Sequence, residues 1–358
     1  MASYKDKVKA DLDRWIGQGL VAADKRDAIL ATLPEARRLD AATALAWIGA
    51  LLMGVAIIAF VAANWDALSR FARFAVLLLA FLIAACGGAW AARAARPVLT
   101  NILLMVASLI FAAAIGLTGQ IFDIAGDPKA ASYGAGVAAL ALALAGRSTG
   151  AAIVGLVFIA LGDFSGRDWF SGLSDDAPWM LLAAPLGAFL ALRWSSAPLA
   201  HAAALAIIYC FWWFAARTSE DAPVLFFLSI ALAAMAAAAR WLGAQDRPFA
   251  TVFYGWFSAA ALLFFAVAGY VPLFGNGENA GIIHRIVWIA ASGGVVALGR
   301  FDRHALVTAI GVLSLMIAIF ATLSDLGLDL MAAAGVFLVC AVVALIGGLA
   351  LRRRKANA

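Results

Sequence analysis

The sequence predicts an all-α protein, a polytopic transmembrane helical bundle, from its composition, the length of its apolar runs and the distribution of its charges. Of the 358 residues, 65% are hydrophobic and 13% are charged, and the mean hydropathy is +0.97. Soluble domains have about 25% charged residues and about 45–50% apolar ones. A chain with so few polar residues cannot cover a water-exposed surface, which excludes a soluble globular fold.

The apolar runs have the length of helical spans. A bilayer core roughly 30 Å thick needs about 20 apolar residues as helix, or about 10 alternating residues as barrel strand. The runs here are long and continuous, without strict alternation, which favours helices. The twelve candidate spans are residues 42–63, 72–92, 98–122, 131–145, 150–164, 178–193, 197–215, 222–242, 249–272, 281–299, 304–323 and 328–351.

The runs at 131–145 and 150–164 are short and leave the number of spans open. Either both cross the membrane, giving twelve spans, or they form a re-entrant pair, giving ten. Both counts are even, so the later spans keep their orientation in either case.

About 40 mostly polar residues precede the first run, so no cleavable signal peptide is expected. We divide the chain into a cytoplasmic helical hairpin (1–40), the transmembrane bundle (41–351) and a basic cytoplasmic tail (352–358). Leu12, Trp15 and Ile16 recur at helical spacing among charged residues and form one apolar stripe. This stripe is either part of a solvated cap beside the membrane or a docking face for a cytoplasmic partner.

The charges predict the orientation. If the connections alternate sides from the N-terminus, 20 of the 26 Lys and Arg fall on one side and 6 on the other, while the acids divide 9 to 12. Basic loops stay in the cytoplasm. Both termini are therefore expected in the cytoplasm, within a bacterial cytoplasmic (inner) membrane. The basic pI of about 9.3 reflects this orientation and gives no reason to expect nucleic-acid binding.

Two polar clusters are expected on the opposite, non-cytoplasmic side. The first run ends in Asn64, Trp65 and Asp66, and the third ends in "GLTGQIFDIAGD", which contains Gly119, Gln120 and Asp123. Trp65 suits the membrane interface, and a polar amide near the end of a span needs a partner. Further acids on that side are Asp163, Asp168, Asp175 and Asp176.

The two clusters allow two interpretations. They either line a polar pocket for a cation or a polar head group, or they cap helices and form interhelical hydrogen bonds beside solvent-exposed acidic loops.

These segments carry a resemblance to a known family. "LDRWIGQGLVAADKRDAIL", a span ending "AANWD" and "GLTGQIFDIAGD" resemble the bacterial integral-membrane family catalogued as domain of unknown function 2157. The resemblance covers roughly residues 8 to 145 and implies a membrane fold without implying an activity. Its motifs single out Trp15, Asn64, Trp65, Gly119 and Gln120.

No motif for catalysis, a cofactor or a metal is present. GxxxxGK[ST], HExxH and GxSxG are absent. Cys86, Cys210 and Cys340 all lie within apolar runs, without metal-ligand spacing. The three histidines lie near different span ends, and we read them as interfacial or hydrogen-bonded side chains.

Three functions are compatible with these observations. A transporter or permease-like protein for a small solute, ion or lipid fits the number of spans and the polar cluster, although no inverted repeat and no mid-membrane charge support it. A non-transporting scaffold or sensor would use the N-terminal docking face. A membrane enzyme with Asp66 or Asp123 as general base ranks last, because no paired group is evident. The lipid bilayer is the one certain partner, and the sequence does not specify an oligomeric state.

The predicted orientation can be tested with topology reporters. Reporters fused before residue 1 and after residue 358 should both signal from the cytoplasm, because the arginine-rich connections lie on that side. Signals from opposite faces, or both from outside, would contradict the even number of spans.

Overall fold

The computed structural model describes residues 4–32, 68–123, 125–165, 177–217, 222–245, 249–269 and 278–326, together with residues 247 and 335. Within these ranges the chain is all-helical, with twelve α-helices, one short 3-10 helix and no strand. The all-α prediction is therefore confirmed for the described residues. The chain divides into two units, residues 1–69 and residues 70–358.

The described part of the first unit contains two α-helices joined by a short connection. Helix α1 (Tyr4–Gly17) is followed by η1 (Ala23–Lys25) and α2 (Arg26–Thr32). Gly19 has a φ of 70°, which glycine adopts without strain where the chain leaves α1. Arg26 Nε donates to Asp13 Oδ1 at 2.8 Å, and this hydrogen bond holds the pKa of the exposed Asp13 carboxyl below its ordinary value. The cytoplasmic location of this segment stays a prediction.

The described part of the second unit contains ten apolar helices that correspond to ten of the twelve predicted runs. The runs at 42–63 and 328–351 lie outside the described residues, apart from residue 335. The ten helices are α4 (Arg70–Arg93), α5 (Pro97–Ile121), α6 (Pro128–Gly146), α7 (Thr149–Phe164), α8 (Met180–Arg193), α9 (Ala197–Arg217), α10 (Ala222–Ala244), α11 (Ala250–Ala268), α12 (Glu278–Phe301) and α13 (Ala305–Asp325).

Eight of these ten helices are long and apolar enough to cross a membrane, while α7 and α8 are shorter. The run predicted at 131–145 is longer than expected, because α6 begins at Pro128 and has 19 residues. Proline is favoured in the first helical turn, where its missing N–H costs nothing. The total number of crossings, including the choice between twelve and ten, stays a prediction.

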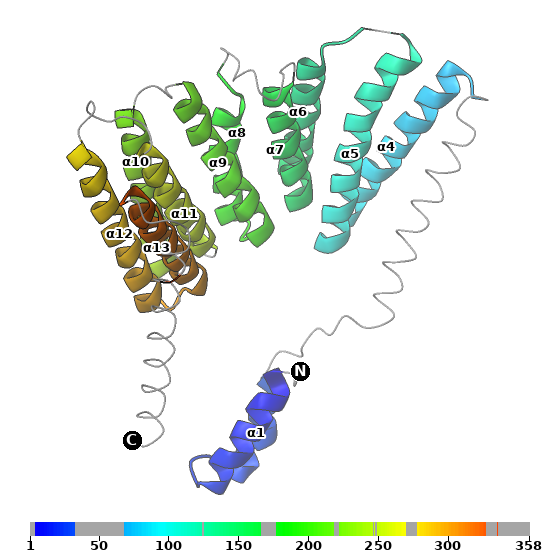
Figure 1. Cartoon of the computed structure of the whole chain (residues 1–358). Coiled ribbons are helices and arrows are strands. Elements are labelled where there is room, and N and C mark those ends of the chain that lie inside the picture. The colour runs from blue at the N-terminus through cyan, green and yellow to red at the C-terminus, as the bar shows by residue number, and fades with distance from the viewer. Residues whose placement is uncertain are drawn as a thin grey trace. The chain divides into compact units, whose positions relative to one another are not determined.

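The ten helices form five consecutive hairpins: α4–α5, α6–α7, α8–α9, α10–α11 and α12–α13. Each hairpin has one non-glycine residue with positive φ in its short turn, and these residues follow one another at intervals of about 50 along the chain. They are Ala95, Arg147, Ser195, Phe249 and Arg303. We call the end of the unit that carries these turns the turn end, and the opposite end the connection end (Figure 1).

Four of the five turns share one hydrogen-bond pattern. The backbone N–H after the positive-φ residue donates to the carbonyl five residues earlier, as in the bond from Arg96 N to Ala91 O at 2.9 Å. This pattern is the Schellman motif, which satisfies the last carbonyls of a helix. The other three bonds of this kind run from Ser148 to Ala143, from Ser196 to Ala191 and from His304 to Gly299. The unit is therefore a direct repeat of helical hairpins, which the sequence analysis did not detect.

The second helices of successive hairpins form a continuous row of contacts. Helix α5 contacts α7, α7 contacts α9, α9 contacts α11, and α11 contacts α13. The first helices pack chiefly against their own hairpin partners, although α6 also contacts α5 and α8 also contacts α7. Such neighbour-to-neighbour packing is typical of repeat proteins. A consequence is that grooves can form where the first helices of successive hairpins separate.

Close packing within a hairpin depends on glycine. In α6–α7, a Cβ added to Gly136 would lie 3.1 Å from the carbonyl oxygen of Gly155, and one added to Gly155 would lie equally close to that of Gly136. The same requirement recurs at α12–α13, where a Cβ on Gly311 would lie 2.7 Å from the backbone nitrogen of Val296. Small residues allow such approach in membranes, where packing and not the hydrophobic effect holds helices together.

Polar contacts tie neighbouring hairpins together near the turn end. Asn101 Oδ1 of α5 accepts from the backbone N of Gly150 at 2.8 Å and from the hydroxyls of Ser148 and Thr149 at 3.0 and 3.1 Å. Trp256 of α11 donates to His201 Nδ1 of α9 at 2.8 Å. These bonds satisfy polar groups that would be costly in an apolar environment.

We predict that Gly136→Ala destabilises the second unit by about 1–3 kcal/mol, because the added methyl overpacks the α6–α7 interface. The measurement is the thermal unfolding of the purified protein in detergent. Gly134→Ala is the matched control, since a Cβ there meets no atom within 4 Å. Equal effects of the two substitutions would contradict the assigned close contact.

Candidate functional site

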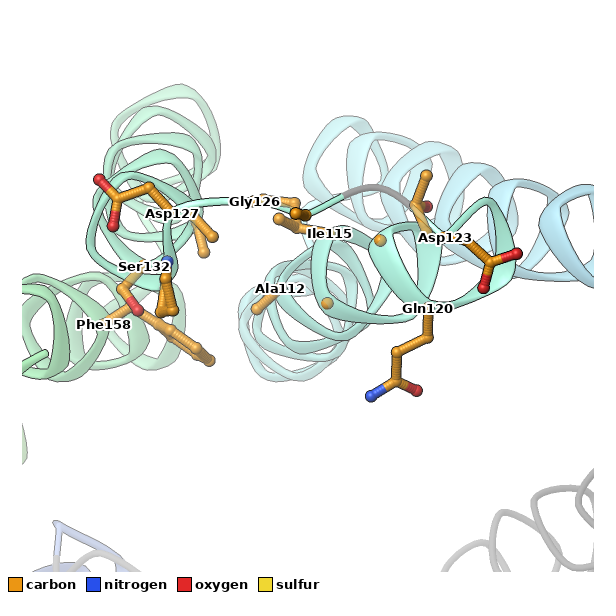
Figure 2. A pocket seen from close by; sticks show the side chains of 15 residues that line it. Ala112, Ile115, Gln120, Asp123, Gly126, Asp127, Ser132 and Phe158 are labelled. Atoms are coloured by element: carbon orange, nitrogen blue, oxygen red, sulfur yellow. The ribbon is translucent and has the colours of Figure 1, made fainter. Parts of the chain in front are cut away.

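Three of the six predicted polar-site residues come together at one cavity. Gly119, Gln120 and Asp123 line a cavity of about 690 Å³ at the connection end, where α5 ends and α6 begins (Figure 2). The other three, Asn64, Trp65 and Asp66, lie outside the described residues. Their convergence with Gln120 and Asp123 stays a prediction.

The cavity exists because its walls carry small residues. Ala112, Gly116 and Gly119 of α5 face Ala131 and Ala135 of α6 across the gap. Two larger residues, Ile115 of α5 and Phe158 of α7, add apolar surface to these walls. The walls are therefore almost entirely apolar. The volume lies within the range of about 300–1,000 Å³ that is usual for ligand pockets.

Polar groups lie at the rim of the cavity. They comprise Thr118, Gln120, Asp123, Asp127 and Ser132. Asp127 and Ser132 were not among the residues predicted for this site, although Asp127 is the last residue of the quoted motif and Ser132 lies five residues after it. The segment "DPKAAS", which begins at that last residue, was the available signal.

The two carboxylates of the rim already have partners. Asp123 Oδ2 accepts from Arg70 Nη2 of α4 at 2.8 Å, and both side chains are exposed. Asp127 caps α6, since its Oδ1 accepts from the backbone N of Lys129 at 2.9 Å. The exposed Asp123–Arg70 pair contributes at most about 1 kcal/mol to stability. Both carboxylates thus remain accessible to a ligand at little energetic cost.

Gln120 differs from its neighbours. Figure 2 shows its side chain leaving α5 in a different direction from that of Asp123. The side chain is exposed, and no residue of the described ranges donates to or accepts from its amide. An amide at the end of an apolar helix can both donate and accept hydrogen bonds. Gln120 is therefore the rim residue best suited to recognise a ligand.

Asp163 has a structural role that the sequence analysis did not foresee. We counted it among the acids of the non-cytoplasmic loops, yet its side chain is buried, with 1% exposed. Its Oδ1 accepts from Tyr133 Oη at 2.7 Å and from Trp179 N at 2.9 Å, and its Oδ2 accepts from Met180 N at 3.1 Å. A carboxylate at the N-terminus of α8 accepts hydrogen bonds from otherwise unpaired N–H groups, and its negative charge interacts favourably with the helix dipole. Asp163 therefore connects the second and third hairpins.

The described residues offer little for catalysis or metal binding. Among them no group of three His, Cys, Asp or Glu residues could hold a metal ion. Asp123 is paired with an arginine rather than with a second acid, and Asp66 lies outside the described residues. The role of Asp66 or Asp123 as the general base of an enzyme stays a prediction.

The predicted docking stripe is only partly at the surface of the first unit. Leu12 is buried, with 1% of its surface exposed, whereas Trp15 is 42% exposed and Ile16 is half-buried. Leu20, which follows α1, is 71% exposed. Any partner of this segment would contact Trp15 and Leu20 rather than Leu12.

The described helices define a membrane protein with several apolar helices. Residues 13–152 match the family model described as predicted membrane protein (DUF2157), which confirms the resemblance found in the sequence. The matched segment contains Trp15, the "NWD" motif and every residue that lines the cavity except Phe158. No curated protein and no solved structure matches the chain.

We expect Asp163→Ala to lower the free energy of unfolding by about 2–4 kcal/mol, because it removes a buried acceptor that takes hydrogen bonds from the Tyr133 hydroxyl and from two backbone N–H groups. Asp123→Ala should change it by less than about 1 kcal/mol, because the Asp123–Arg70 pair is exposed. Thermal unfolding of both purified variants distinguishes the structural acid from the acid at the cavity rim. The reverse order of effects would refute the assignment.

Proposed function

We propose that this chain is a multi-pass protein of the bacterial cytoplasmic membrane that binds an amphiphilic molecule in the α5–α6 cavity and moves it in a permease-like manner. The single observation that carries the proposal is the cavity itself, which combines apolar walls with a polar rim. We further propose that both termini are cytoplasmic, with the turn end in the cytoplasm. The basic turns support this orientation.

The walls and the rim together suggest the class of ligand. Ile115 and Phe158 suit a hydrocarbon portion, whereas Gln120 and the carboxylates of Asp123 and Asp127 suit a head group with a cation or hydroxyls. Arg70, paired with Asp123, can contact a phosphate of the same head group. A zwitterionic lipid or a similar amphiphile satisfies both requirements.

The depth of the cavity supports movement rather than surface binding alone. Its lining on α5 extends from Asp123 back to Ala112. The helical part of this stretch spans about 14 Å, close to half of the roughly 30 Å hydrocarbon core. A head group that enters at the connection end can thus reach about the middle of the membrane along a wall formed largely by alanine and glycine.

A second candidate function is a scaffold or sensor. The exposed Trp15 and Leu20 support it, because they are large apolar side chains on a small polar segment, where a partner would bury them. Deletion of residues 1–38 separates the two functions. A scaffold should lose its co-purifying partner, whereas a carrier should keep most of its flux.

We predict that Gln120→Ala and Ala131→Phe each reduce movement of a labelled zwitterionic lipid in liposomes by at least about five-fold, a loss of roughly 1 kcal/mol of ligand interaction. The first removes the recognition amide and the second fills the cavity. Ala130→Phe is the matched control, because Ala130 is exposed and does not line the cavity. Flux that is unchanged in both cavity variants would eliminate this route, and equal loss in the control would show a nonspecific effect.

A further inference from the structure

A second groove lies between the third and fourth hairpins. It has a volume of about 210 Å³, and every residue that lines it is apolar. Helices α9 and α11 pack together behind it, while α8 and α10 make few or no contacts with each other. The groove is thus a direct consequence of hairpins joined through their second helices.

The groove is located at the turn end, opposite to the α5–α6 cavity. Leu192 is the residue before the end of α8, Leu242 lies in the last turn of α10, and Ala250 begins α11. From Ala250 to Phe257 the lining extends about 10 Å along α11. The groove therefore has one end at the turns and the other among the apolar helices.

Two basic residues lie close in sequence to the residues that line the groove at the turn end. Arg193 directly follows Leu192 at the end of α8, and Arg247 lies in the turn before α11. Both are exposed, and neither forms an ion pair with a described residue. In addition, each of the five turns carries or adjoins at least one exposed arginine, and the full set is Arg93, Arg96, Arg147, Arg193, Arg247, Arg300 and Arg303.

Acidic residues do little to neutralise this end. Asp302 is the described acid there, and Arg240 binds it through two hydrogen bonds at 2.6 and 2.8 Å. These bonds hold the pKa of Asp302 below its ordinary value, so it stays charged and paired. The sequence adds Asp246, which lies outside the described residues. The turn end therefore has a strong excess of positive charge.

We propose that the groove between α8 and α10 is a binding site for an anionic phospholipid. Part of one acyl chain lies in the groove against Ala188, Met235 and Phe257, and the phosphate binds Arg193 and Arg247. Basic pockets between transmembrane helices are suited to such head groups, since charge and apolar burial act on one molecule. This site is independent of the proposed transport function, because it lies at the opposite end of the unit and has rim charges of opposite sign.

The test measures binding of dioleoylphosphatidylglycerol and dioleoylphosphatidylcholine to the full-length protein in detergent by native mass spectrometry. The anionic lipid should bind more tightly. Arg193→Gln/Arg247→Gln should weaken its binding by about thirty-fold, the loss expected for two basic contacts. Arg93→Gln/Arg147→Gln is the matched control, because it removes two exposed arginines from the same end but from other hairpins.

The apolar half of the proposal has its own variant. Ala238→Phe should fill the groove and reduce anionic-lipid binding at least ten-fold, whereas Ala237→Phe, at an exposed position outside the groove, should leave it unchanged. Unfolding temperatures measured without added lipid confirm that the variants fold. Glycerol 3-phosphate, which has the phosphate without acyl chains, should not displace the lipid.

Three results would overturn the site. Equal binding of the two lipids would remove the role of charge, and equal losses in both arginine pairs would show a diffuse surface instead of a site. Displacement by glycerol 3-phosphate at the concentration of the lipid would show a phosphate site without a groove.

Discussion

The structure depends on how the backbone reverses direction between two apolar helices. Each backbone N–H and C=O needs a partner where water is scarce, and a reversal leaves the last carbonyls of the first helix without one. The shared turn of the hairpins solves this problem, because the residue at positive φ redirects the chain and the following N–H returns to the carbonyl five residues earlier. This solution is repeated with alanine, arginine or serine at the left-handed position. The backbone strain of these residues is small compared with the cost of an unsatisfied carbonyl.

Short turns determine how the helices pack. Two helices joined by so few residues must lie against each other, and glycines such as Gly136 and Gly155 allow their backbones to approach. Successive hairpins then meet through their second helices, with Asn101 and Asp163 as polar connections between them. Because the first helices are less constrained, spaces form beside them. The cavity near Gln120 and the groove near Phe257 both arise between neighbouring hairpins.

The two spaces differ in the charges around them, and this difference follows from their positions. The connection end has acidic groups at the cavity rim, whereas the turn end has exposed arginines in or beside every hairpin turn. The arginine distribution that orients a chain in a membrane thus also supplies one end of the repeat with anion-binding groups. The buried Asp163 and the half-buried Asn101 already have their hydrogen-bond partners, so their role is structural. Gln120, exposed at the rim, is the stronger candidate for recognition.

The sequence by itself determined that the chain is an all-α membrane protein, since composition and run length leave no other way to satisfy the backbone in lipid. It also identified Gln120 and Asp123 as neighbours, because they lie within one helix end, and it found the family to which residues 13–152 are matched. It did not reveal the hairpin repeat, since the shared feature is a backbone conformation adopted by different residue types. The sequence also did not show that Asp163, unlike the exposed acids, is buried and hydrogen-bonded, because its donors Tyr133 and Met180 are distant in sequence. Which polar groups are satisfied and which are open to a ligand was decided by the tertiary structure, since hydrogen-bond partners from different helices meet only after the hairpins have packed.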